Sequence, residues 1–272
     1  MSILVTGKGS SGSWQIRGVQ LGNAIGADVI PTAQNVRGRD VLVVKKDNGC
    51  VLTGAKSIIW DVVDCWPQPE GNLQSREQHI SNIHKIAKRM RAEYLIAATK
   101  QMAKDLDTPY YLYHHGRHYQ KPHVAPEHVH RVGYEGSEMF LGKWKYLMEQ
   151  ECLIRGWDFV INPTDLTTCD ILVAFRDYPY KGYATDNWKS NVKLQNAQNA
   201  GVPIICNPEA GYLETATGAE LFITDKKGLT SALDQLSGQS ERLWRSAQMQ
   251  NNRYYLADAA KDLRNILCLM GK

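Results

Sequence analysis

Residues 187–214 read NWKSNVKLQNAQNAGVPIICNPEAGYLE and carry the clearest structural signal in the chain. Apolar residues recur at helical spacing toward residue 200, which predicts a helix over residues 189–200 that lies on a sheet. Gly201 stands where a helix ends, and Pro203 follows because proline cannot continue a helix. Residues 204–206 are then expected to form a short buried strand.

A polar loop over residues 207–212 follows this strand, at the edge where open α/β sheets bind ligands. It carries Glu209, and Glu214 lies just beyond it. Lys189 and Lys193 are one helical turn apart, so we expect them to share a face near the helix start, where backbone N–H groups also favour anions. Cations, N–H groups and carboxylates together suit a ligand with a diphosphate and a sugar, which indicates a nucleotide sugar.

This stretch resembles the donor-binding segment of GT-B glycosyltransferases. In that family a K-x-x-x-K-L-type helix start precedes an A-x-x-A/C-G-x-P-V/I turn and a P-E-x-G-Y-x-E-type loop, and the likeness here covers residues 130–225. The resemblance implies that Lys193 contacts the donor diphosphate and that Glu209 or Glu214 holds the ribose or the transferred sugar. Gly211 and Tyr212 of the same loop are further donor-binding candidates.

Composition excludes several other classes of protein. The chain has 272 residues, 43% of them hydrophobic and 22% charged, which is typical of a globular protein with an ample core. No apolar run approaches the roughly 20 residues that span a bilayer. The six cysteines are scattered without a C-x-x-C pair. We therefore expect a cytoplasmic protein without membrane contact, disulfides or a structural zinc site.

Charge is distributed unevenly along the chain. Residues 1–130 have a net charge of +5 and contain all eight histidines, whereas residues 131–272 have a net charge of −1. This asymmetry indicates that the first half meets a polyanion such as DNA. A solvated basic surface without a particular partner is the alternative.

Strand-like and helical patterns alternate from end to end, which predicts parallel sheets flanked by helices. Residues 119–130 contain two prolines without periodicity and are interpreted as a linker. We predict an α/β, GT-B-like fold with two Rossmann-like domains facing a central cleft. Residues 1–130 would be the acceptor-side domain and residues 131–272 the nucleotide-sugar domain, with a final helix or helix pair over residues 240–269 that crosses back.

The loop after the first strand contains G-x-G-x-x-G at Gly7, Gly9 and Gly12. The acidic residue expected about twenty positions later in a dinucleotide-binding unit is not evident, and a P-loop is absent. In GT-B proteins the corresponding loop faces the cleft, so the resemblance makes Gly9 and Ser11 donor-binding candidates. A turn needed only for close packing is the alternative. The acceptor-binding candidates of this half are aromatic or basic: Trp14, Arg17, Trp66, His114 and Arg117.

Two further elements of the first half could take part in catalysis. Asp64 lies nearer the carboxyl end of an apolar strand than Asp61, so it is the preferred general base, with loop capping as the alternative. The HHGRH segment at residues 114–118 follows another predicted strand and places His115 among the catalytic candidates. Its spacing lacks a helical H-x-x-x-H, which argues against a metal site.

The start of the second half resembles the Gly-Tyr-x-Gly segment of many GT-B transferases. Tyr134, Gly136 and Ser137 would form its strand end and helix start, with backbone N–H groups aimed at a donor phosphate. Ser137 as a plain helix cap is the alternative. Arg176, just past another predicted strand, would complete the donor ring.

The leading hypothesis is a metal-independent hexosyl- or pentosyltransferase that uses a nucleotide sugar and no other cofactor. Lys193, with Asp64 and His115, would carry the catalysis, and charge stabilisation of the leaving diphosphate needs no metal. Small, basic enzymes of this plan include phage-type transferases that glycosylate hydroxymethylated bases in DNA. DNA is therefore one candidate for the acceptor, and a small molecule, a glycan or a protein is the alternative.

Two other hypotheses stay open: a sugar-nucleotide epimerase on the same scaffold, and a non-catalytic nucleic-acid-binding module. The epimerase would use a cleft carboxylate and the HHGRH segment on the sugar itself. The binding module predicts that alanine at Lys193 or Glu209 is tolerated. The sequence carries no signal for the sugar, the nucleotide or the oligomeric state.

Overall fold

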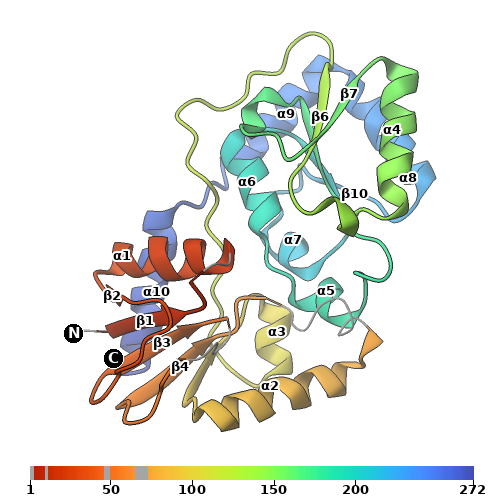
Figure 1. Cartoon of the computed structure of the whole chain (residues 1–272). Coiled ribbons are helices and arrows are strands. Elements are labelled where there is room, and N and C mark those ends of the chain that lie inside the picture. The colour runs from red at the N-terminus through yellow and green to blue at the C-terminus, as the bar shows by residue number, and fades with distance from the viewer. Residues whose placement is uncertain (1–2, 10–11, 46–49, 65–72) are drawn as a thin grey trace. The chain divides into compact units, whose positions relative to one another are not determined.

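The structure is a computed structural model that describes residues 3–9, 12–45, 50–64 and 73–272. It divides into two compact units (Figure 1). Unit 1 comprises Met1–His115, Tyr183–Ser190 and Leu256–Lys272, and unit 2 comprises Gly116–Gly182 and Asn191–Tyr255. Over the described residues each unit contains one five-stranded parallel sheet. This is the α/β class with two Rossmann-like sheets that the sequence predicts.

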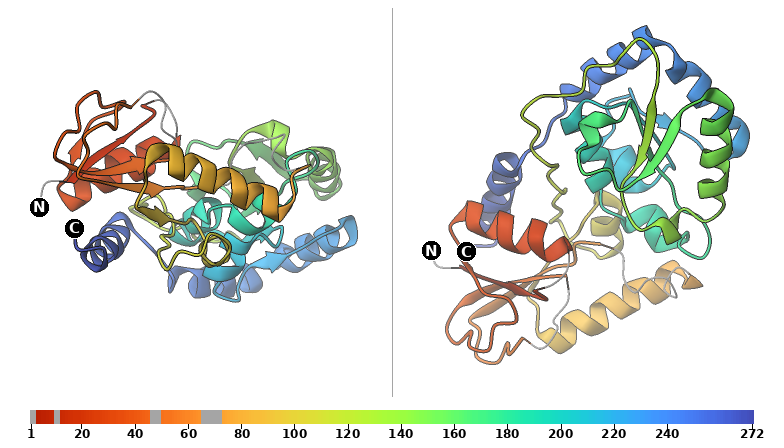
Figure 2. Two further views of the ribbon diagram at one scale, coloured as in Figure 1. Left: turned by 90° about the horizontal axis from the view of Figure 1, so that it is seen from below. Right: turned by 45° about the horizontal axis from the view of Figure 1, so that its top comes forward.

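Unit 1 is built around a sheet of order β2-β1-β3-β4-β5. Its elements are β1 (Ile3–Gly7), the π-helical segment η1 (Trp14–Gln20), α1 (Leu21–Ile25), β2 (Asp28–Val29), β3 (Asp40–Val44), β4 (Ser57–Asp61), α2 (Arg76–Met90), β5 (Tyr94–Ile96), α3 (Lys100–Asp105), α5 (Tyr183–Trp188) and α10 (Leu256–Leu269). β1, β3 and β4 are buried along their whole length, as expected for parallel strands covered on both faces. The apolar side chains of α2, α3 and α5 pack on one face, and α10 lies beside α1 (Figures 1 and 2).

Unit 2 is built around a sheet of order β10-β9-β8-β6-β7. Its elements are β6 (Arg131–Tyr134), the 3-10 segment η3 (Glu138–Phe140), α4 (Lys143–Arg155), β7 (Asp158–Ile161), the 3-10 segment η4 (Leu166–Thr168), β8 (Ile171–Ala174), α6 (Val192–Ala200), β9 (Ile204–Cys206), α7 (Ala210–Thr215), β10 (Leu221–Phe222), α8 (Lys226–Ser237) and α9 (Gln239–Gln250). α4 and α8 pack on one face of the sheet, and α6, α7 and α9 pack on the other.

The two sheets share one topology. In each, the first strand of the unit has the second strand on one side and the third on the other. Such a reversal of strand order opens a crevice at the carboxyl ends of the strands, where α/β proteins bind ligands. It lies between β1 and β3 in unit 1 and between β6 and β8 in unit 2.

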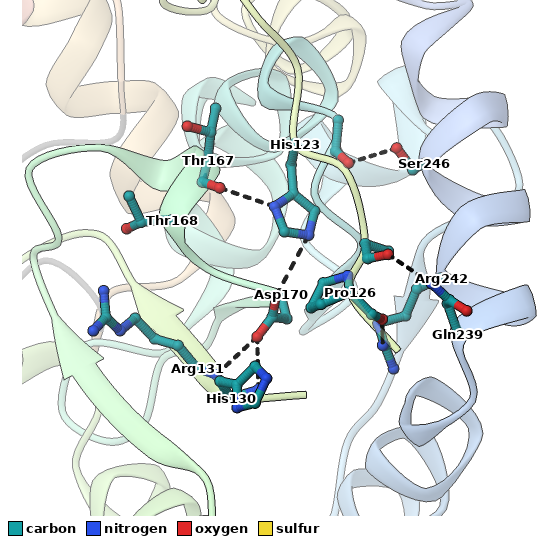
Figure 3. Close-up of polar contacts among 12 residues, drawn as sticks. His123, Pro126, His130, Arg131, Thr167, Thr168, Asp170, Gln239, Arg242 and Ser246 are labelled. Carbon is teal, nitrogen blue, oxygen red and sulfur yellow. Dashed lines mark hydrogen bonds and ion pairs between the residues drawn. The ribbon is translucent and has the colours of Figure 1, made fainter. Parts of the chain in front are cut away.

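Residues 119–130, interpreted from sequence as a linker, form no regular element but lie on unit 2 (Figure 3). One imidazole nitrogen of His123 lies 2.8 Å from the Thr167 carbonyl oxygen and the other 3.6 Å from the Asp170 carboxylate. The same carboxylate accepts hydrogen bonds from the backbone N–H groups of His130 and Arg131. Because the guanidinium of Arg242 also donates to the Pro126 carbonyl, the whole segment is fixed to this unit.

The helix predicted over residues 189–200 begins only at Val192, so the expectation that Lys189 shares its face is wrong. Trp188 explains the difference. Its fully buried indole donates a 2.7 Å hydrogen bond to Asp105, which holds this part of the chain in unit 1. The preceding Asn187 carbonyl accepts from the Thr99 hydroxyl at 2.8 Å, and the chain must turn before α6 can start.

Other predicted boundaries also differ. The helix expected from Ser137 starts at Lys143, because Gly142 adopts a φ of +51° and separates η3 from α4. The predicted strand over residues 110–113 is a single bridge from Tyr111 to Ala97. The loop over residues 207–212 gives way to α7, whose Tyr212 is buried. The predicted helix pair near the end of the chain is present as α9 and α10.

No helix in the described part of the chain combines the length and the apolar character needed to span a membrane.

Candidate functional site

The crevice of unit 2 gathers five of the predicted donor-binding residues, which we call the Lys193 cluster: Tyr134, Gly136, Arg176, Lys193 and Glu209. They come from the carboxyl ends of three adjacent strands, β6, β8 and β9, and from the first turn of α6. Tyr134 is the common neighbour of the others. Its hydroxyl accepts a 3.1 Å hydrogen bond from Lys193 Nζ, which also lies 4.2 Å from the centre of its ring.

Arg176 and Glu209 form a buried ion pair at the ends of β8 and β9. The Nε–Oε1 distance is 2.8 Å, and both side chains are about 5% exposed or less. The Asn207 side-chain oxygen accepts from the backbone N–H of Arg176 at 2.8 Å, which ties the two strand ends together. Burial raises the pKa of Tyr134 to about 12, with Arg176 opposing this and Glu209 adding to it. The hydroxyl of Tyr134 therefore stays protonated and can donate as well as accept.

Gly136 leaves space beside the Lys193 ammonium. A Cβ at this position would lie 2.8 Å from Lys193 Nζ and 3.1 Å from the Tyr134 hydroxyl, and the backbone φ is +138°. Both facts favour glycine, which tolerates this conformation and lets a ligand approach the backbone. Glycine at position 136 is thus explained by the cation next to it.

The turn at Gly136 is held by a residue that the sequence did not single out. Asn162 accepts a 2.8 Å hydrogen bond from the Gly136 N–H and donates a 2.9 Å bond to the Gly136 carbonyl. Asn162 itself has a φ of +53° just after β7. An Asn that follows a predicted strand is a signal for left-handed backbone, because Asn tolerates that region better than most residues.

The remaining donor candidates are placed differently. Ser137 is exposed at the start of η3, and its carbonyl accepts from the Tyr134 hydroxyl at 3.2 Å. Tyr212 is buried on α7 beside Glu209, and burial raises the pKa of its hydroxyl well above 10. Gly211 is buried next to it, whereas Glu214 is partly exposed on the same short helix.

Lys189 lies in unit 1, where its ammonium pairs with the carboxylate of Asp64. Both side chains are mostly buried, and the pair lies just beyond the end of β4. The structure therefore brings the predicted general base together with a cation that the sequence had placed in the donor site.

Arg17, an acceptor-binding candidate, is 1% exposed and is used inside unit 1. Its guanidinium makes two hydrogen bonds to Asp61, at 2.9 and 3.0 Å, and donates to the carbonyls of Leu112 and Tyr113. Trp14 is also buried, and its ring fills the space above Gly18, where a Cβ would lie 2.2 Å away. Both side chains are therefore part of the interior of unit 1.

His114 and His115 are buried at the same edge of unit 1. Burial, with the positive charge of Arg17 nearby, lowers the pKa of His115 to about 4 and that of His114 well below 6.5. Both rings are therefore neutral at pH 7. His115 Nε2 lies 2.9 Å from the side-chain oxygen of Gln20, an arrangement that selects the Nε2–H tautomer.

Arg117, the last member of the HHGRH candidates, lies in unit 2 and pairs with Glu135, next to Gly136. Gly9 is exposed beside Pro31 in unit 1. Ser11 and Trp66 lie outside the described residues. Within the described ranges, no three His, Cys, Asp or Glu side chains gather as a metal site would require.

Comparison with known proteins gives no match to a family model and none to a curated sequence. Solved structures do match. WaaG, a glycosyltransferase involved in lipopolysaccharide biosynthesis, superposes with a TM-score of 0.60 at 10% identity, over 97% of this chain and 99% of its own.

Anabaena HepE in complex with UDP-glucose gives a TM-score of 0.62 at 11% identity, over 99% of this chain and 100% of its own. A glycosyltransferase from Rickettsia africae gives 0.58 at 9% identity, over 100% and 99%. At such low identity the likeness establishes the fold, and the chain accordingly has the two-sheet GT-B fold found in glycosyltransferases.

Proposed function

We propose that the protein is a glycosyltransferase that binds a nucleotide-diphosphate sugar at the Lys193 cluster of unit 2. The observation that carries this proposal is the convergence of Lys193, Arg176 and the glycine turn at Gly136 on one sheet crevice. Two cations beside the space left by Gly136 are suited to a diphosphate, and the Glu209 carboxylate is suited to sugar hydroxyls. The matched GT-B structures, one of which contains UDP-glucose, support the same reading.

In the proposed reaction an acceptor oxygen forms a bond to the anomeric carbon of the donor sugar while the bond to the diphosphate breaks. The charge that develops on the leaving diphosphate would be stabilised by Lys193 and Arg176. The acceptor proton would pass to a base, for which unit 1 offers Asp64 and the neutral His115. Such a step needs no metal ion, so we expect turnover to persist in EDTA.

DNA with a hydroxymethylated base is the acceptor that the charge of the first half favours. The described cations that support this reading are exposed on α2 of unit 1: Lys85, Lys88 and Arg89. Transfer of labelled glucose from UDP-glucose to hydroxymethylcytosine DNA, with unmodified DNA as the control, tests this acceptor. Turnover with another hydroxyl acceptor and none with DNA would leave the transferase standing and reject the DNA acceptor.

A thermal-shift screen with UDP, GDP, ADP, CDP and TDP tests the donor site, with plasmid DNA beside it. A ligand at about 100 times its Kd adds roughly 2.7 kcal/mol of stability, which moves the melting temperature measurably. We expect one diphosphate, with UDP the first candidate, to stabilise the protein and Lys193→Ala to abolish the shift. The exposed Lys227 of α8 provides the matched control, Lys227→Ala, which should keep it. Stabilisation by DNA alone would favour a nucleic-acid-binding module.

A further inference from the structure

α6 buries amide side chains along much of its length, which is unusual for a helix packed on a sheet. Gln195, Asn196, Gln198 and Asn199 are each 3% exposed or less. Buried amides require hydrogen-bond partners, because an unpaired polar group away from water is costly. The partners of these four amides therefore show what this face of α6 holds in place.

Asn199 holds two segments of chain that are far apart in sequence. Its side-chain N–H group donates to the carbonyls of Arg117 at 3.0 Å and Tyr254 at 3.3 Å, and its oxygen accepts from the Tyr254 N–H at 3.2 Å. The Gly116 N–H donates to the Tyr254 carbonyl at 3.0 Å, so the two segments also bind each other. A Cβ at Gly116 would lie 2.5 Å from the Asn199 amide nitrogen, so only glycine fits here.

These contacts lie where the chain passes between the two units. The passages occur at residues 115/116, 182/183, 190/191 and 255/256. Gly116 and Tyr254 stand at two of them, and Asn191, which immediately precedes α6, stands at a third. At three of the four passages, residues of the chain therefore contact α6 or directly precede it.

The same row of amides reaches the Lys193 cluster. Asn196 accepts a 2.8 Å hydrogen bond from the Arg117 N–H and donates one of 2.8 Å to the Glu135 carboxylate. Glu135 directly precedes Gly136, and Lys193 lies one helical turn before Asn196 on α6. Hydrogen bonds, joined through the chain at Glu135 and Arg117, thus connect the turn at Gly136 to Gly116 and Tyr254.

We propose that Asn196 and Asn199 are positioning residues that couple ligand binding at the Lys193 cluster to the chain passages at Gly116 and Tyr254. The proposal rests on the proposed function for the identity of the ligand. A ligand that orders the Gly136 turn also orders the two passages through these amides, and loosening the passages weakens binding by the same factor, because coupling between sites is reciprocal.

Hydrogen exchange without ligand tests the coupling first. Asn199→Ala removes the contacts to Arg117 and Tyr254, together with the 3.1 Å hydrogen bond that the Asn199 oxygen accepts from Gln195 within α6. We expect faster exchange both at Gly116 and at the remote Gly136 N–H. Gln198→Ala is the matched control, because Gln198 is equally buried on α6 but bonds to the Thr215 carbonyl and to Glu220. Unchanged exchange at Gly136 in Asn199→Ala, or an equal increase in Gln198→Ala, would overturn the proposal. Asn196→Ala serves as a second variant if Asn199→Ala does not fold.

UDP binding provides the second readout. UDP is expected to slow exchange at Tyr254 in the wild type, and Asn199→Ala should bind UDP about tenfold more weakly, as expected for one to two lost hydrogen bonds. Gln198→Ala should stay within about twofold. Equal UDP affinity in all three proteins would reject the coupling while the proposed function stands. If the wild type binds none of the nucleoside diphosphates, the proposed function fails, and the ligand-free exchange still decides the coupling.

Discussion

The two sheets have the same strand order, but Arg17 and Lys193, at their carboxyl edges, have different surroundings. In unit 1 the guanidinium of Arg17 is enclosed by Asp61 and two carbonyls, and the neighbouring histidines are neutral. In unit 2 the ammonium of Lys193 lies on a tyrosine ring beside a glycine that leaves space. Identical topology therefore does not assign a binding role, and the surroundings of each cation do.

The largest effect is expected where a charge is enclosed. Arg17→Met leaves the Asp61 carboxylate buried without its cation, which should lower the free energy of unfolding by about 3–5 kcal/mol. Urea denaturation measures this, with Arg89→Met on the exposed face of α2 as the control. A loss below about 1 kcal/mol would mean that Arg17 is not the internal support of unit 1 that the comparison requires.

The next effect concerns the buried ion pair of Arg176 and Glu209 in unit 2. Arg176→Lys keeps the positive charge beside Glu209 but loses the planar fork that binds two oxygens at once. We expect kcat/KM for the nucleotide sugar to fall about 10–100-fold while the melting temperature changes little. A steady-state assay with varied UDP-glucose provides the measurement. Unchanged kinetics would place Arg176 with Arg17, among the structural cations.

In unit 1 the buried His115 makes the stability of the fold depend on pH. The unfolded chain protonates His115 near pH 6.5, whereas the folded protein keeps it neutral down to about pH 4. The unfolded state therefore binds more protons in this window, and stability falls as the pH drops from 6.5 to 4.

Replacing His115 should remove its part of that loss. His115→Gln is expected to lose about 2 kcal/mol less than the wild type between pH 7 and pH 4.5, measured by urea unfolding at both values. His84→Gln, at an exposed position of α2, should follow the wild type. If both variants lose as much as the wild type, His115 is not the neutral buried group described above.

The smallest effect is expected at the glycine that distinguishes unit 2. Gly136→Ala introduces a Cβ 2.8 Å from Lys193 Nζ at a φ of +138°. Nucleotide affinity should fall about tenfold, since strain at such a position is of order 1–3 kcal/mol. Calorimetric titration with UDP measures this, and Gly12→Ala in unit 1, where a Cβ meets nothing within 4 Å, should bind as the wild type does.

The sheets could be predicted because their strands are apolar runs, and both crevices follow from parallel strands that alternate with helices. Arg176 and Glu209 were found because each follows such a run, and Lys193 was found because it stands at the start of a helix. The position of Lys189 was not predictable in this way, because it depends on the burial of Trp188 against Asp105, more than 80 residues away in sequence.

The amide face of α6 escaped notice for a related reason. Helical periodicity is judged from apolar residues. In the sequence Gln195-Asn196-Ala197-Gln198-Asn199 the amides are therefore expected to be exposed to solvent. Its amides are buried because residues far away in sequence, such as Arg117, Thr215 and Tyr254, supply their partners. The same holds for Arg17 and His115, whose partners lie in other elements of unit 1.

The division of the chain has a consequence for how the molecule is made. α10, which includes some of the last residues of the chain, lies beside α1, and Lys272 pairs with Asp40 at the start of β3. A ribosome delivers the first 115 residues of unit 1 early, but α10 only after the whole of unit 2. Domains usually complete in the order of synthesis. Here all of unit 2 is synthesised before α10, so the side of α1 that α10 contacts stays uncovered until the chain beyond residue 255 has been made.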